Sequence, residues 1–341
     1  MKHLILLPAV VVCVAAVSAS PESKVDFWSY ASGGADAVLY VNTKQAEKAV
    51  DEKLYGQIKK DKHKAIDEMD EKSILADKVR DLEGVANIYI TNADGSTGVK
   101  IEGVARVYGG KKSIKSAIEK LSADAKETGF GVSSKKAGKL TASCFDIPAI
   151  GETPAMNGVV TPLDNELFHY KFTIGSTNAL SHFCPKGDGL SNPVIARISQ
   201  SDASLAFVCD AQRLAGYITA TNQNASVLKA ILSVSKTATV ICRAKSRAFK
   251  VAVTFEFLAE DTATAYAQMI QPTVALLNQR MAKDGMLSGF DVRKYQKNLT
   301  LSFDIGIDTA WKQIMQMTGS QSGNFGREER RTMKSKKGIS K

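Results

Sequence analysis

Apolar and polar side chains alternate most regularly in the segment "AFKVAVTFEFL", residues 248–258. Every second residue from Phe249 to Phe257 is Phe or Val, and the residues between them are Lys, Ala, Thr and Glu. Because successive side chains of a strand point to opposite faces, this period of two predicts an antiparallel strand with one buried face. The segment "LTLSFDI", residues 299–305, has the same period, and it puts its four apolar residues on one face and Asp304 on the other.

Segments of the same kind follow one another in the same order in the two halves of the chain. In the first half we predict strand, helix, two strands, helix and two strands at residues 36–42, 46–58, 84–91, 99–108, 111–121, 130–134 and 140–147. In the second half we predict strand, helices, hairpin, helix and two strands at residues 202–210, 211–232, 237–258, 261 onward, 289–295 and 299–305. The pattern therefore predicts an α+β fold, a tandem duplication of a ferredoxin-like (split βαβ) unit with antiparallel sheets and helices on one face. Whether the two units share one sheet or pack face to face stays open.

Proline, glycine and charge divide the chain further. Pro and Gly are concentrated around residues 149–165 and again in "CPKGDGLSNP", residues 184–193. The predicted organisation is a signal peptide at 1–19, a linker at 20–34, a first α+β repeat at 35–185 with a Pro/Gly-rich insertion near 149–165, a connector at 186–200, a second α+β repeat at 201–320 and a disordered basic tail at 321–341.

The first residues, "MKHLILLPAVVVCVAAVSAS", carry a lysine, an apolar run and then small residues. This order is typical of a secretory signal peptide. The apolar run from Leu4 to Val17 is shorter than the roughly 20 residues needed to cross a bilayer, which disfavours a retained anchor. We expect an exported protein of the periplasm, cell surface or extracellular space, with no transmembrane segment in the mature chain.

The formal net charge is +10, and part of it lies in the tail "GREERRTMKSKKGISK". The basic residues of this tail could bind anionic surfaces such as glycans or lipid headgroups; they are Arg327, Arg330, Arg331, Lys334, Lys336 and Lys337. The alternative is a solvated terminus. Export, and the lack of aromatic residues between the basic ones, disfavour a nucleic-acid partner.

Four cysteines follow the predicted signal peptide: Cys144, Cys184, Cys209 and Cys242. An oxidising compartment would permit two disulfides among them. Three of the four lie in apolar, strand-like segments, where cysteine also serves as a small core residue, so both interpretations stay open. The sequence has no Cys-x-x-Cys pair of the kind found in zinc sites.

The segments "GKLTASCFDIP" and "KNLTLSFDIG" both contain Phe-Asp-Ile, which aligns Asp146 with Asp304. Two carboxylates about 3 Å apart can share a proton and activate water, so this pair is a candidate for hydrolysis. A second alignment, without a gap, lays residues 170–180 on residues 301–311 and matches Thr173 to Asp304. In that alignment the catalytic pair disappears and Asp304 is an ordinary residue of a solvent face.

His182 and Cys184 form a weak candidate for one edge of a metal site or a thiol–imidazole pair, with no third ligand nearby in the sequence. We expect no cofactor, because the chain contains none of the common catalytic or nucleotide-binding motifs. These observations favour a non-enzymatic binding or assembly protein of the cell envelope or extracellular surface, with envelope proteins or anionic surfaces as partners. The alternatives are a secreted, peptidase-like hydrolase that uses paired carboxylates and a periplasmic protein that binds a small ligand.

Overall fold

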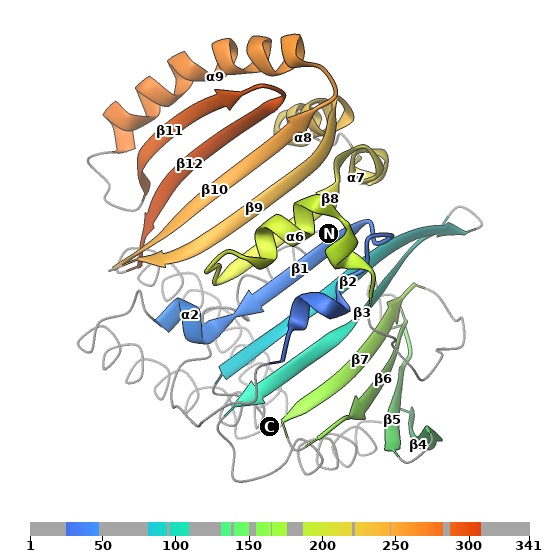
Figure 1. Cartoon of the computed structure of the whole chain (residues 1–341). Coiled ribbons are helices and arrows are strands. Elements are labelled where there is room, and N and C mark those ends of the chain that lie inside the picture. Colours follow the sequence, from blue (N-terminus) through green and yellow to red (C-terminus); the bar gives the residue numbers. More distant parts are fainter. Residues whose placement is uncertain are drawn as a thin grey trace, which may run out of the picture.

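The computed structural model describes residues 25–47, 81–93, 96–108, 131–137, 140–149, 155–164, 166–175, 187–219, 222–245, 247–281 and 287–307. Within them, twelve strands form one sheet in the order β11-β12-β10-β9-β8-β1-β2-β3-β7-β6-β5-β4 (Figure 1). Neighbouring strands of this sheet pair antiparallel. The two halves of the chain therefore share one continuous sheet.

The strands of the first half are β1 (Ala37–Asn42), β2 (Asp81–Ala93), β3 (Ser96–Tyr108), β4 (Gly131–Ala137), β5 (Leu140–Ile147), β6 (Met156–Pro162) and β7 (Leu167–Ile174). Those of the second half are β8 (Leu205–Asp210), β9 (Ser235–Lys245), β10 (Ala248–Phe257), β11 (Leu287–Tyr295) and β12 (Asn298–Gly306). The helices are η1 (Phe27–Tyr30), α2 (Thr43–Glu47), η2 (Gly189–Ser191), α6 (Pro193–Ser199), α7 (Ala211–Tyr217), α8 (Gln223–Ser233) and α9 (Glu260–Met281).

The predicted α+β character, a mostly antiparallel sheet with helices, is confirmed, but the ferredoxin-like arrangement is not. A split βαβ unit needs a crossover that returns the chain to a parallel strand. Here the first strand of each half pairs directly and antiparallel with the second, β1 with β2 and β8 with β9. The hydrophobic pattern predicted most of the strands that the structure describes, but not β6, and it did not predict which strands pair.

One core lies on the face of the sheet that η1 and α6 cover, at the junction of the two halves. Phe27 and Trp28 are buried there, and the ring of Trp28 stacks on that of Tyr40 with centroids 4.8 Å apart. Val194, Ile195 and Ile198, on the inner face of α6, belong to the same cluster. Phe27, Trp28 and Ala31 therefore belong to the core, within the stretch expected to be a linker, and the packed helix α6 lies within the expected connector at 186–200.

The stretch expected to be an irregular insertion near 149–165 contains a strand. Residues 156–162 form β6, which pairs with β5 on one side and with β7 on the other. Val159 and Thr161 are buried in it. Its Pro162 is the last residue of the strand, where a missing backbone N–H interrupts no further pairing.

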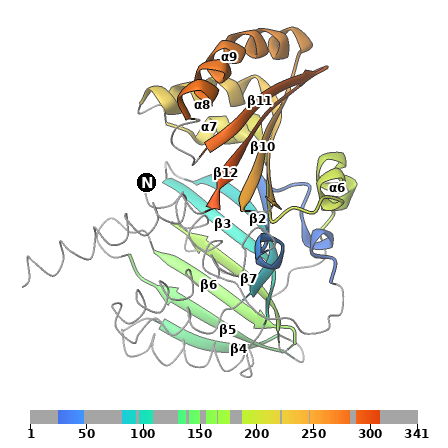
Figure 2. The same ribbon diagram turned by 90° about the vertical axis from the view of Figure 1, so that its left-hand side faces the viewer.

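Helices α7, α8 and α9 cover the opposite face of the sheet over the second half (Figure 2). Buried residues of α7 and α8 pack there on Ala37, Cys209 and Ala238 from the centre of the sheet. The helices predicted at 211–232 and from 261 are confirmed as α7, α8 and α9. No helix in the described part of the chain is both long and apolar enough to cross a membrane. The helices predicted at 111–121 and beyond residue 47 lie outside the described residues.

We expect Phe27→Ala to lower the free energy of unfolding by about 3–5 kcal/mol, because it empties a fully packed position at the junction core. Urea denaturation followed by tryptophan fluorescence measures this change. Tyr295→Ala is the control, since Tyr295 is 72% exposed and its removal should change stability by less than about 0.5 kcal/mol. Equal effects of the two changes would show that Phe27 does not belong to the core.

Candidate functional site

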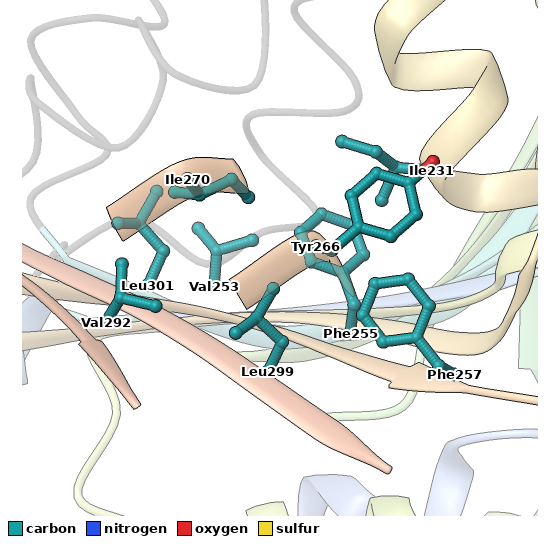
Figure 3. Close-up of a pocket in the computed structure, with 9 residues that line it drawn as sticks. All are labelled: Ile231, Val253, Phe255, Phe257, Tyr266, Ile270, Val292, Leu299 and Leu301. Carbon is teal, nitrogen blue, oxygen red and sulfur yellow. The ribbon is translucent and has the colours of Figure 1, made fainter. Parts of the chain in front are cut away.

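A cavity of about 240 Å³ lies between α8, α9 and the sheet of the second half. Its nine lining residues are all aliphatic or aromatic; they are Ile231, Val253, Phe255, Phe257, Tyr266, Ile270, Val292, Leu299 and Leu301 (Figure 3). The hydroxyl of Tyr266 is the only polar side-chain atom among them. In Figure 3 that hydroxyl lies beside Ile231, at the α8 side of the cavity.

The floor of the cavity follows from the alternation of β10 and β12. Val253, Phe255 and Phe257 point to one face of β10, and Leu299 and Leu301 point to the same face of β12. The polar residues between them lie on the other face, where the hydroxyls of Thr254 and Thr300 are hydrogen-bonded at 2.9 Å. The predicted apolar faces are therefore confirmed, and together they form the floor.

The roof of the cavity is α9. Tyr266 and Ile270 are four residues apart, so they lie on the same face of the helix, one turn from each other. The ring of Tyr266 stacks on that of Phe257, with centroids 5.2 Å apart and planes inclined by 20°. This contact fixes the aromatic end of the roof to the floor.

Polar contacts fasten both ends of α9 to the edge strand β11. The side chain of Asn278 donates to the carbonyl of Phe290 at 2.8 Å and accepts from the backbone N–H of the same residue at 2.9 Å. At the other end, Lys294 Nζ lies 2.6 Å from Glu260 Oε1. Gly289 precedes Phe290 with a φ of +63°, in the left-handed region that favours glycine, at an irregularity in the β11–β12 pairing.

The lining of the cavity is almost entirely hydrocarbon. None of the nine lining side chains is ionisable near neutral pH, and the Tyr266 hydroxyl is the one side-chain group among them that can form a hydrogen bond. Apolar cavities of this kind stay dry and accept apolar guests. The cavity is also somewhat smaller than the roughly 300–1,000 Å³ of typical sites for drug-sized ligands, so it suits part of a molecule better than a whole one.

The structure does not bring Asp146 and Asp304 together. Asp146 lies on β5 and Asp304 on β12, nine strand positions apart in the sheet, or roughly 40 Å along it at about 4.8 Å per strand. Asp304 faces Lys250 of β10 in the register, and Thr173 faces Lys100 of β3 in the same way. This register agrees with the gap-free alignment, in which Thr173 and not Asp146 corresponds to Asp304.

Cys144, Cys209 and Cys242 are free thiols, so no disulfide joins them. Cys209 pairs with Ala238 and Cys242 with Leu205, which places the two cysteines of the β8–β9 pair four residues apart along the strands, about 13 Å. That exceeds the roughly 7 Å that a disulfide spans between Cα atoms. Burial raises the pKa of the Cys209 thiol to about 11, so it is a core residue and not a nucleophile.

The remaining candidates from the sequence, His182, Cys184 and the six basic residues of the tail, lie outside the described residues. Within the described residues, no group of three or more His, Cys, Asp or Glu side chains is placed to hold a metal ion.

One polar feature that the sequence did not reveal is the buried pair of His169 and Thr161. They are cross-strand neighbours on β7 and β6, 4% and 3% exposed. Within the part of the chain that the structure describes, His169 Nε2 and Thr161 Oγ1 have no hydrogen-bond partner. Burial lowers the pKa of His169 to about 4, with Glu102 opposing and Lys171 adding to the shift.

Comparison with known proteins identifies no family: no family model matches the chain, and no curated protein matches it. Among solved structures, crystal forms I, III and IV of TP0453 are similar to it, each with a TM-score of 0.41. Their sequence identities are 12%, 11% and 12%; the matches cover 86%, 86% and 88% of this chain and 98%, 100% and 97% of the other chains. No functional conclusion follows from likenesses of this strength.

We expect the free energy of unfolding to fall as the pH is lowered from 6.5 to 4, with His169 contributing about 3 kcal/mol. The unfolded chain takes up a proton on this imidazole below its ordinary pKa, whereas the folded chain does so only near pH 4. His169→Gln should remove this component, measured as the difference between urea titrations of variant and parent at each pH. Thr161→Val, which keeps the imidazole, should retain it. Identical pH profiles of His169→Gln and the parent would contradict the assignment.

Proposed function

We propose that the protein is an exported, non-catalytic binding protein that holds the hydrocarbon part of a small amphipathic ligand between α8, α9 and the sheet. The observation that carries the proposal is the cavity itself, whose walls are formed by nine aliphatic or aromatic side chains from five elements. The export is supported by the leader-like first residues, "MKHLILLPAVVVCVAAVSAS". Of the three functions considered from the sequence, this combines the binding protein with the capture of a small ligand.

The size of the cavity sets the length of hydrocarbon that fits. If each methylene group takes up roughly 30 Å³, the volume of one water molecule in the liquid, a cavity of 240 Å³ holds on the order of eight methylene groups. Burying them contributes about 6 kcal/mol at roughly 0.8 kcal/mol each. Association itself costs an estimated 4–15 kcal/mol. A chain of this length therefore binds weakly by its hydrocarbon alone, which suits a carrier that must also release its ligand.

The competing hypotheses receive less support. Hydrolysis by paired carboxylates requires two acids in contact, and Asp146 and Asp304 are nine strand positions apart. Assembly through an exposed sheet edge would use β4 or β11, the two outer strands. β4 is exposed and carries Lys135 and Lys136, which are residues that keep an edge from pairing with another chain.

We also infer that the two halves arose by tandem duplication, although not of a ferredoxin-like unit. β1 and β8 meet at the centre of the sheet, and in each half the next two strands form a hairpin that pairs with the last strand. Asn42 and Asp210 end these two central strands. Their side chains accept from the backbone N–H of Gln45 and Arg213, three residues on, and so cap the helices that follow.

The duplication bears on function because it gives both halves an apolar sheet face. In the second half, the apolar faces of β10 and β12 form the cavity floor. At corresponding positions of the first half, Phe168 and Tyr170 of β7 pair with Ala105 and Gly103 of β3, and their rings lie next to each other with centroids 6.0 Å apart. The two halves therefore have an apolar sheet face on a common plan, and in the second half this face lines the cavity under α9.

We expect Val253→Phe to abolish binding of apolar probes, because the larger side chain fills the cavity from its floor. The measurement is a fluorescence titration with N-phenyl-1-naphthylamine, an uncharged apolar fluorophore, together with thermal unfolding to confirm that the variant is folded. Ala252→Phe places the same ring on the opposite face of β10 and is the matched control, with binding unchanged. Unchanged binding in folded Val253→Phe would refute a ligand site in this cavity.

A further inference from the structure

We infer that the ligand is a carboxylate with a single linear chain, and that Lys294 binds its head group at the rim of the cavity. This inference rests on the proposed function, since it assigns the class of ligand that the apolar cavity holds. It also assigns a role to a residue that no sequence motif singles out.

Lys294 lies beside the cavity and on its side of the sheet. It is two residues along β11 from Val292, so both side chains point to the same face. In the register it is paired with Leu299 of β12, which lines the cavity, just as Val292 is paired with Leu301. On the face of β11 that is turned toward α9, the apolar Val292 is thus followed by the cationic Lys294 at the rim of the cavity.

A carboxylate already occupies this position. Glu260, the first residue of α9, places Oε1 2.6 Å from Lys294 Nζ. The lysine side chain is 28% exposed and the glutamate side chain 55% exposed, so the glutamate can turn into solvent while the ammonium stays at the rim. A carboxylate whose chain enters the cavity would take the place of the glutamate on Lys294.

The charged residues around the rim favour a ligand whose head group has a single negative charge. Lys297 lies at the same end, and its Nζ donates to the carbonyl of Leu258 at 3.0 Å. Glu260 and Asp261 form the acidic first turn of α9. Exchange of one carboxylate for another keeps the local charge balanced, whereas a doubly charged phosphate would meet the repulsion of both acids.

The hydrocarbon chain alone binds weakly, so differences in affinity between ligands come from the head group. A charged hydrogen bond to Lys294 distinguishes a carboxylate from a neutral alcohol of the same length, because the apolar walls are equally favourable to both chains. The rim therefore sets specificity and the cavity sets the length of the chain.

The test is displacement of N-phenyl-1-naphthylamine from the full-length protein by decanoic acid and by decan-1-ol at pH 8. We expect the acid to bind more tightly than the alcohol. Lys294→Gln should raise the Kd of the acid about tenfold and leave that of the alcohol unchanged. Glu260→Gln should lower the Kd of the acid, because the internal competitor loses its charge.

Lys236→Gln is the matched control. Lys236 also belongs to an exposed pair of the second half, 3.9 Å from Glu256, but Glu256 alternates with Phe255 and Phe257 and so points away from the cavity. Loss of such exposed pairs costs little stability, so both lysine variants should fold. Affinity for decanoic acid should be unchanged in Lys236→Gln.

The outcomes separate this inference from the proposed function. Equal affinity of the acid and the alcohol, or equal weakening of both by Lys294→Gln, would overturn the role of Lys294 while leaving a hydrocarbon site. Two other results would overturn the cavity as the binding site, and the inference with it. One is failure of the probe to bind the parent protein. The other is that Val253→Phe leaves the binding of the acid and the alcohol unchanged.

Discussion

The antiparallel pairing of β1 with β8 is the interaction on which the rest of the fold depends. Two backbone hydrogen bonds close its ends, from Asn42 N to Ser204 O at 2.8 Å and from Asp210 N to Asp36 O at 2.9 Å. Each of the cores on the two faces of the sheet also takes buried residues from both strands. Because neither half has a free edge at this position, separating the halves would expose both cores and a row of backbone donors and acceptors.

From this junction, packing becomes less complete toward β11. Near the centre, small buried residues such as Ala37 and Ala215 let α7 and α8 approach the sheet closely. Farther out, α9 is the main cover of this face among the helices that the structure describes. Its own buried residues, Ala263 and Val274, lie on either side of Tyr266 and Ile270, which form the roof. The helix is thus held on both sides of the cavity and does not collapse into it.

The faces of the strands could be predicted from the sequence, but their neighbours in the sheet could not. The alternation of residues 249–257 and 299–305 correctly predicted the apolar strand faces that form the cavity floor, because side-chain direction is a local property of a strand. Pairing of β1 with β8 joins residues about 168 positions apart, such as Leu39 and Phe207, and no local pattern encodes it. The cavity itself could not be predicted, since its volume depends on how closely side chains of five separate elements approach. Phe27 and Trp28 were misassigned to a linker because a short 3-10 helix has too few residues for a period.

The space between α9 and the sheet links the fold to the proposed function. Its walls are apolar side chains, and apolar surface is more stable when it is removed from water. A larger residue at one floor position, such as Phe at position 253, would cover part of this surface from within the chain. With Val253 beside Leu299 and Leu301, the same surface is available to an apolar guest, whose burial contributes about 0.8 kcal/mol for each methylene group.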